Sequence, residues 1–222
     1  MTLKQLLETN NVSITSEQLE KLNTLREIVL IENKNFNLTS ITKEEEFNVK
    51  HILDSMKLLE YDIDNKKVID VGTGAGFPGL VLAIMLPNSK FTLLDSAAKK
   101  ITFINKTIEE LKLSNVETVT SRAEIHTEKY DVVITRAVAP LQILSEICLN
   151  LADTQLHMKG PNIDEELPAN AKDFSLKLGV EISDINRYNL IDFGRTIATI
   201  KTISKPSKGY PRIYSQIVKE SK

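Results

Sequence analysis

From residue 63 onward, short apolar runs alternate with longer segments of helical periodicity, and this alternation restricts the possible folds more than any other feature. The strand-like runs are KKVIDVG (66–72), KFTLLDS (90–96), NVETVT (115–120), YDVVITRA (130–137) and TQLHMKG (154–160). The segments between them, 77–86, 97–113 and 140–151, have helical length and spacing. Strands and helices in this order predict βαβ units, and therefore a parallel sheet with helices on both faces.

The chain continues with a charged helix predicted over 163–178 and two more strands predicted over 180–190 and 195–203. The sequence pattern of residues 1–60 predicts helices instead of strands. Ser16 is the predicted N-cap of a helix with an apolar face of Leu19, Leu22, Leu25 and Val29. After a loop over 34–42, a helix over 43–60 is predicted to bury Val49, Ile52, Met56 and Leu59.

These boundaries predict three parts of the chain. An N-terminal helical extension (1–62) is expected to pack on an α/β core (63–204), and a basic tail (205–222) follows. Charge is unevenly distributed along the chain, because the tail is basic although the whole chain has a net charge of −2. The residues from 201 onward set one acidic side chain, Glu220, against six basic ones, Lys201, Lys205, Lys208, Arg212, Lys219 and Lys222. Such asymmetry indicates either a polyanionic partner or a solvated tail.

Composition excludes several classes of protein. No apolar run reaches the length of about 18 residues that a membrane span needs, and the N-terminus lacks the apolar core of a signal peptide. The single cysteine, Cys148, excludes an internal disulfide, and the three histidines lack the spacing of metal ligands. We therefore expect a cytoplasmic protein with no bound metal, and a monomer is the default expectation.

A glycine-dense turn, DVGTGAGFPG (70–79), directly follows the first predicted strand. Ligands of open parallel sheets bind at the carboxyl ends of the strands, so this turn is the expected floor of a site. A phosphate-binding P-loop would need a lysine that the turn lacks. A dinucleotide fingerprint, G-x-G-x-x-G, would need a third glycine where Phe77 stands.

The spacing found here is instead G-x-G-x-G, formed by Gly72, Gly74 and Gly76, with Asp70 two positions earlier. This pattern is typical of proteins that bind S-adenosylmethionine (SAM), which has no pyrophosphate for a helix N-terminus to bind. A plain tight turn is the alternative. Asp95 ends the next strand, where a carboxylate can accept the ribose hydroxyls of SAM or of NAD, or can cap the following helix.

Several further strings occur in an order that resembles one family. They are NLTSIT (37–42), HILDS (51–55), LLDSAAKKITFI (93–104), SRAE (121–124), TRAVAPL (135–141), MKG (158–160) and YPR (210–212). Together with the glycine turn, they resemble the RsmG (GidB) family of bacterial 16S ribosomal RNA guanine-N7 methyltransferases over about residues 20–215. His157 departs from the apolar residue expected in its strand.

The resemblance implies a class I SAM-dependent methyltransferase, with a Rossmann-like, mostly parallel seven-stranded sheet. It implies methylation of N7 of the guanine at position 527, in the 530 loop of 16S rRNA, either free or in the small ribosomal subunit or its assembly intermediate. By matching motif, SAM contacts fall on Gly72, Phe77, Ala123, Glu124 and Arg136. Gly74, Gly76 and Asp95 belong to the general class I pattern.

No catalytic residue is assigned, because guanine N7 carries a lone pair and no proton, so attack on the methyl needs no general base. Arg136 is expected in the cofactor cleft, where it can bind the base at O6 or the carboxylate of SAM, or can form a structural ion pair with Asp70 or Glu124. The substrate candidates are Asn37, His51, Asp54, Ser55, Lys159 and Arg212. Each of these residues could instead have a purely structural or solvent-exposed role, such as a local His51–Asp54 pair or a solvated Lys159.

Two other classes of function stay open. The same fold serves methyltransferases that act on another RNA, a protein or a small molecule, and fold alone does not separate them. A nucleoside-binding module without enzymatic activity is the second alternative.

Overall fold

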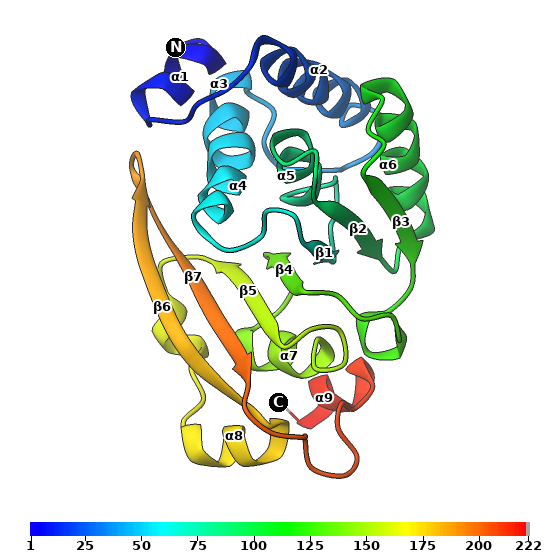
Figure 1. Cartoon of the computed structure of the whole chain (residues 1–222), viewed down its shortest axis with the longest axis vertical. Coiled ribbons are helices and arrows are strands. Elements are labelled where there is room, and N and C mark those ends of the chain that lie inside the picture. The colour runs from blue at the N-terminus through cyan, green and yellow to red at the C-terminus, as the bar shows by residue number, and fades with distance from the viewer. Residues whose placement is uncertain (221–222) are drawn as a thin grey trace.

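The computed structural model describes residues 1–220, so Lys222 of the predicted tail lies outside the described residues. Within this range, one sheet of seven strands has the order β3-β2-β1-β4-β5-β7-β6 (Figure 1). All pairings are parallel except those of β7 with β5 and β6. The strands are β1 (Lys67–Val71), β2 (Lys90–Asp95), β3 (Val116–Thr120), β4 (Val132–Arg136), β5 (Thr154–Lys159), β6 (Val180–Leu190) and β7 (Phe193–Thr202). The predicted mostly parallel seven-stranded sheet is confirmed.

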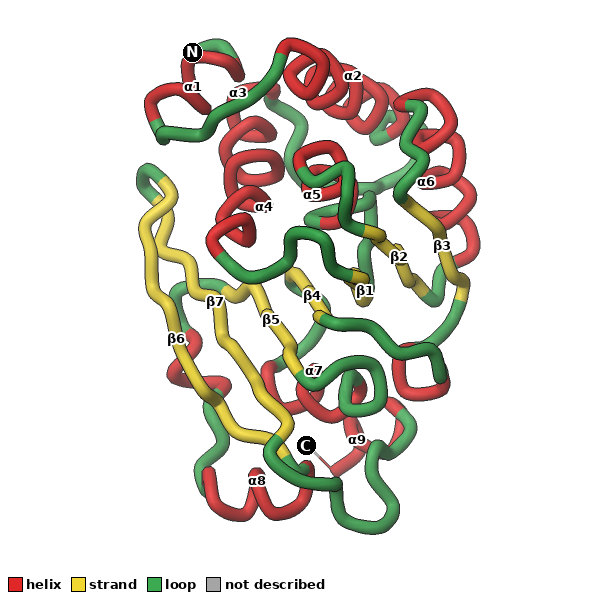
Figure 2. Tube along the Cα trace, viewed as in Figure 1, coloured by secondary structure: helices red, strands yellow, loops and turns green. Residues whose placement is uncertain are grey.

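Helices cover both faces of the sheet, as predicted (Figure 2). One face is covered by α1 (Leu3–Thr9), α2 (Ser16–Glu32), α3 (Glu44–Phe47), α4 (Asp54–Met56), α5 (Gly79–Met85) and α6 (Ala98–Leu111). The other face is covered by α7 (Leu141–Ile147), α8 (Ala171–Leu178) and α9 (Tyr214–Glu220). Alternate strand residues supply the two cores: Val68 faces the first group of helices and Ile69 the second. The alternation follows from the two-residue period of a strand.

The N-terminal helices share a continuous apolar core with the sheet. Leu22, Leu25 and Val29 of α2 are fully buried there, as the sequence predicted, and Leu19 is half-buried. The N-cap of α2 is Thr15 and not the predicted Ser16, because the Thr15 hydroxyl accepts the backbone N–H of Gln18 in a capping box. The helical segment that ends at residue 60 has the predicted extent but is not regular.

That segment passes from α3 through the π-helical turn η1 (Asn48–Leu53) to α4 and the 3₁₀ turn η2 (Lys57–Glu60). A π turn rotates the following residues relative to an α-helix. Here the buried set includes His51, Asp54 and Ser55, which a regular apolar stripe would not bury. The irregular turn therefore directs polar side chains toward the sheet, at the carboxyl ends of its strands.

The charged helix predicted over 163–178 is wrong as a single element. The segment forms the 3₁₀ turn η4 (Ile163–Glu166) and then, after Leu167 and Pro168, α8. Proline removes a backbone donor and disfavours helical geometry in the residue before it, which ends the first turn. Asn170 then caps α8 by accepting the N–H of Asp173.

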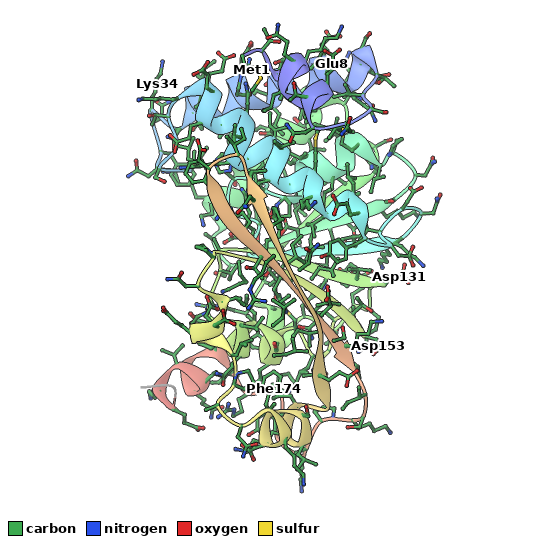
Figure 3. The ribbon with its side chains drawn as sticks, turned by 90° about the vertical axis from the view of Figure 1, so that its left-hand side faces the viewer. Met1, Glu8, Lys34, Asp131, Asp153 and Phe174 are labelled. Carbon is green, nitrogen blue, oxygen red and sulfur yellow. The ribbon has the colours of Figure 1, made fainter. Side chains whose placement is uncertain are left out.

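The long β6–β7 hairpin runs from α8 to the N-terminal helices (Figure 3). This hairpin brings Arg195 of β7 and Tyr188 of β6 to the helical segment 44–60, more than a hundred residues away in sequence. His157 on β5 is fully buried and does not disturb the sheet, because Thr135 and the Gln155 side-chain oxygen hydrogen-bond its two ring nitrogens, both at 2.9 Å.

Candidate active site

Two adjoining cavities open at the carboxyl ends of the central strands. The larger, about 640 Å³, is lined by the glycine turn, the end of β4, η1 and β7. The smaller, about 300 Å³, lies between the ends of β1 and β2, the turn η3 (Ala123–Ile125) and the start of α9. Gly72, Lys100, Ala137 and Val138 line both cavities. An elongated ligand can therefore pass over Gly72 from one cavity into the other.

The glycines of the turn are needed for conformation and for space. Gly72, Gly74 and Gly76 have φ values of +70°, +62° and +94°, which L side chains rarely adopt. A Cβ on Gly72 would lie 2.6 Å from the Val138 side chain, and one on Gly76 would lie 2.3 Å from Leu80. A Cβ on Gly74 would meet only the Gly72 carbonyl oxygen, at 4.0 Å, and would otherwise project into open space. The bare main chain at Gly74 thus leaves a cradle in which a ligand can approach the backbone.

Asp70 supports this turn from beneath. Its Oδ2 accepts the Thr73 hydroxyl at 2.7 Å and the Gly79 N–H at 2.9 Å, which joins the turn at Thr73 to the start of α5. Oδ1 is buried and, among the described residues, has no hydrogen-bond partner. Burial without a full set of donors raises the pKa of Asp70 to about 6. Asp70 therefore shapes the turn, and it makes no ion pair with Arg136.

Asp95 lies at the edge of the smaller cavity, at the end of β2. Its Oδ2 accepts the N–H of Gly74 at 3.1 Å and lies 3.6 Å from the Lys100 ammonium, while Oδ1 accepts the N–H of Ala97 at 2.9 Å. Each carboxylate oxygen has two lone pairs, so Asp95 keeps acceptor capacity for ribose hydroxyls while it supports the turn. Ribose binding is thus compatible with its geometry, whereas the predicted capping role is wrong, because the N-cap of α6 is Ala97 and no side chain of the described residues caps this helix.

Ala123 and Glu124 also line the smaller cavity, on η3. The side chain of Ala123 is buried and apolar, which suits a flat base. Glu124 Oε1 accepts the backbone N–H of Tyr214 at 3.0 Å, so this carboxylate holds the start of α9. Together, Asp95 and Ala123 give the smaller cavity an acceptor for hydroxyl groups and an apolar surface for a flat ring.

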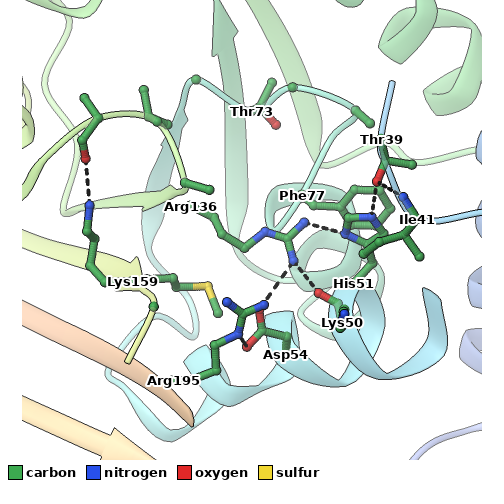
Figure 4. Close-up of a pocket in the computed structure, with 18 of the residues that line it drawn as sticks. Thr39, Ile41, Lys50, His51, Asp54, Thr73, Phe77, Arg136, Lys159 and Arg195 are labelled. Atoms are coloured by element: carbon green, nitrogen blue, oxygen red, sulfur yellow. Dashed lines mark hydrogen bonds and ion pairs between the residues drawn. The ribbon is translucent and has the colours of Figure 1, made fainter. Parts of the chain in front are cut away.

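Arg136 ends β4 and projects into the larger cavity, where it contacts the π-helical turn (Figure 4). Its Nη1 donates to the Lys50 carbonyl at 2.9 Å and lies 3.6 Å from Asp54 Oδ2, and its Nη2 contacts His51 Nδ1 at 2.7 Å. The structural ion pair considered from the sequence is therefore made with Asp54, and not with Asp70 or Glu124. Through these contacts Arg136 joins the N-terminal extension to the sheet at the site.

His51 is a neutral side chain in this arrangement. Because Arg136 donates to Nδ1, the ring proton is assigned to Nε2, which lies 2.9 Å from the Thr39 hydroxyl. Burial, followed by the charges of Arg136 and Arg195, lowers the pKa of His51 to about 3. The imidazole stacks on Phe77 of the glycine turn, with ring centroids 4.5 Å apart. His51 and Phe77, both site candidates from the sequence, thus form one aromatic wall.

Asp54 is buried between two guanidinium groups and a phenol. Its Oδ1 accepts the Tyr188 hydroxyl at 3.0 Å and lies 3.5 Å from Arg195 Nε. A local His51–Asp54 pair does not form; each residue contacts Arg136 instead. Sequence reasoning missed Arg195, which lines the larger cavity, because β7 showed only strand alternation and no motif. A charged residue at the start of an otherwise buried strand was the one available signal.

The remaining substrate candidates lie in different places. Lys159 lines the larger cavity, but its ammonium donates to the Ala139 carbonyl at 2.7 Å and pairs with Glu166 at 2.6 Å. Ser55 is fully buried and donates to the His51 carbonyl, so it stabilises η1. Asn37 is exposed beside the cavity-lining Leu38 and Thr39. Arg212 lies outside both cavities and pairs with Glu146.

The two buried histidines predict a pH dependence of stability. The pKa of His51 and that of His157 are each lowered from 6.5 to about 3. At pH values between these two pKa values, the unfolded state therefore binds up to two more protons than the folded state. Asp70, raised to about 6, acts in the opposite direction and binds a proton in the folded state. The net excess in the unfolded state is about one proton, so the free energy of unfolding should fall as pH is lowered from 7 to 5.

His157→Gln isolates one of these contributions, because His157 lies away from both cavities. When the pH is lowered from 7 to 5, the free energy of unfolding in urea should fall by about 2 kcal/mol less in this variant than in wild type. Identical pH dependence in the two proteins would contradict the burial of a neutral His157.

Comparisons with known proteins add to this geometry. A family model described as GidB, rRNA small subunit methyltransferase G, matches residues 18–188. A Mesoplasma florum protein named ribosomal RNA small subunit methyltransferase G is 42% identical, covering 98% of this chain and 95% of that protein. One of the same name from Mycoplasma capricolum is 38% identical, covering 97% and 96%.

The fold also resembles solved structures. The crystal structure of M. jannaschii TYW2 in complex with AdoMet aligns with a TM-score of 0.55 at 16% identity, covering 69% of this chain and 77% of that chain. At this identity the likeness concerns the fold alone. In residues 1–220, no helix is both long and apolar enough to cross a bilayer.

Proposed function

Because the chain belongs to the GidB family, rRNA small subunit methyltransferase G, we propose that it transfers the methyl group of SAM to N7 of the guanine at position 527, in the 530 loop of 16S rRNA. One observation carries this proposal: the nucleoside-sized cavity beside Asp95 and Ala123 meets the larger cavity at Gly72. A cofactor with its nucleoside in the first cavity has its reactive end facing the second.

SAM supplies an electrophilic methyl group on a sulfonium, and the protein supplies binding and orientation. Asp95 and Ala123 are proposed to hold the nucleoside, while the bare backbone at Gly72 and Gly74 accommodates the linking atoms. The aromatic wall of His51 and Phe77 is proposed to orient the target base in the larger cavity. Positioning of this kind suffices for an in-line displacement by a nitrogen that carries no proton.

The charge state of the larger cavity supports this chemistry. The target guanine gains positive charge as the methyl is transferred, so an additional free cation beside N7 would oppose the reaction. His51 is neutral, and the guanidinium of Arg136 is oriented by Asp54 and by the Lys50 carbonyl. We therefore propose Arg136 as a positioning residue that holds the cavity wall in place.

The experiment is methyl transfer from labelled SAM to 16S rRNA, offered free, in an assembly intermediate and in the small subunit. The expected product carries the label on N7 of the guanine at position 527. Label on another atom or position would overturn the substrate assignment. Label on a protein or small molecule, with none on rRNA, would indicate one of the alternatives that the fold also allows. A cytoplasmic location and a monomeric state belong to the same proposal, and gel filtration tests the latter.

A further inference from the structure

The C-terminal end of the described chain does not extend into solvent as a free basic tail. Residues 210–220, here named the C-terminal clamp, fold back on α7 and end in α9 (Figure 1). Ile217 of α9 is buried in the same apolar cluster as Ile147 of α7 and Cys148, the C-cap of that helix. An apolar residue buried at this place shows that the segment packs as part of the folded protein.

Arg212 anchors the clamp. Its Nε and Nη2 bind the two carboxylate oxygens of Glu146 at 2.8 and 2.7 Å, and its backbone N–H also donates to Glu146 at 2.9 Å. Glu146 is 3% exposed, and Arg212 also pairs with Glu220. A bidentate pair to a buried carboxylate fixes both position and direction. The basic residue that the sequence suggested for RNA contact is therefore engaged within the protein.

This anchor places Tyr214 at the smaller cavity. Tyr214 lines it together with Asp95 and Ala123, the residues proposed for the nucleoside. Its backbone N–H is held by Glu124, and the Arg122 guanidinium lies over its ring, 5.3 Å from the centroid. The backbone and the ring of Tyr214 are thus both held by residues that line the same cavity.

We propose that the C-terminal clamp forms the outer wall of the cofactor cavity, and that Tyr214 is a further cofactor-binding residue whose ring contacts the adenine. This inference rests on the proposed use of SAM. Flat aromatic side chains bind nucleobases through their faces, and the stacking of one base on one ring commonly accounts for a tenfold or larger part of affinity. Glu124 and Arg122 act as positioning residues, because they hold Tyr214 at the cavity.

The test is calorimetric titration of SAM and of S-adenosylhomocysteine into wild type, Tyr214→Phe, Tyr214→Leu and Tyr214→Ala. Tyr214→Phe should keep the wild-type affinity within about twofold, because it keeps the ring. Tyr214→Leu and Tyr214→Ala should weaken both ligands about tenfold or more. Tyr214→Leu keeps apolar volume, so an unchanged melting temperature in that variant separates binding from folding. Ile213→Ala is the matched control, because Ile213 is 50% exposed and lines neither cavity.

The outcomes distinguish this inference from the proposed function. If wild type binds SAM and Tyr214→Leu and Tyr214→Ala bind it equally well, the clamp inference is wrong while the cofactor assignment stands. If these variants keep SAM affinity but bind 16S rRNA more weakly, the clamp faces the RNA and the inference is again overturned. If wild type does not bind SAM, the proposed cofactor is wrong, and the clamp inference that rests on it is wrong as well. Slower hydrogen exchange in residues 210–220 with S-adenosylhomocysteine would support contact between the clamp and the ligand.

Discussion

Arg136→Ala should lower the rate of methyl transfer at least about 100-fold and the free energy of unfolding by about 3 kcal/mol. The guanidinium is the contact between β4 and the π-helical turn that forms one wall of the larger cavity. Its removal leaves Asp54, which is 1% exposed, with less compensating charge. When catalysis depends on positioning, a shift of the cavity wall by about 1 Å is enough to lower the rate about 100-fold.

Single-turnover transfer to 16S rRNA and urea unfolding are the two measurements. Arg136→Lys keeps the charge but cannot reach the Lys50 carbonyl and His51 together, so it should recover stability more than rate. Arg187→Ala is the matched control, because Arg187 forms an exposed pair with Asp164 outside both cavities. Unchanged SAM affinity and turnover in a folded Arg136→Ala protein would contradict a role for Arg136 in the site.

Gly72→Ala should weaken SAM binding at least about 30-fold and lower the free energy of unfolding by about 2–4 kcal/mol. The backbone at Gly72 has a φ of +70°, which costs an alanine about 1–2 kcal/mol. The added Cβ would also lie 2.6 Å from Val138, and overpacking of this kind costs about 1–3 kcal/mol. Both effects would distort the backbone at Gly72, which lines both cavities, so the substitution should weaken SAM binding as well as stability.

Gly160→Ala is the matched control for this substitution. Gly160 lines the larger cavity, but a Cβ there would meet no atom within 4 Å, and its φ is not in the left-handed region. Calorimetry with SAM and urea unfolding should therefore place Gly160→Ala close to wild type. Equal SAM affinity in Gly72→Ala and Gly160→Ala would show that the turn is not part of the cofactor site.

Local sequence determined the order and type of the elements in the sheet. Apolar runs of strand length, such as 66–72 and 90–96, became β1 and β2, because each is buried on both faces in a parallel sheet. The helix 97–113 was predicted from the spacing of four apolar residues, Ile101, Ile104, Ile108 and Leu111. In α6 all of them are buried except Ile108, which is half-buried. The glycine turn was recognised because positive φ values favour glycine at Gly72, Gly74 and Gly76.

Local sequence failed where a distant contact decided the conformation. The segment 43–60 reads as an ordinary amphipathic helix, but it takes a π turn whose His51 and Asp54 contact Arg136. The helix predicted over 163–178 was wrong for a local reason instead, because the prediction did not take account of Pro168, which separates η4 from α8. The basic tail suggested solvent or RNA, because no local pattern indicates that Arg212 finds the buried Glu146.

The sequence by itself therefore determined the sheet, the glycine turn and the family, because strand and helix periodicity and short motifs are local properties of the chain. Only the tertiary structure decided how the larger cavity is closed, because Asp54, Arg136 and Arg195 come from three distant segments and meet through charge and burial. The same holds for Tyr214, which reaches the smaller cavity only after α9 has packed on α7.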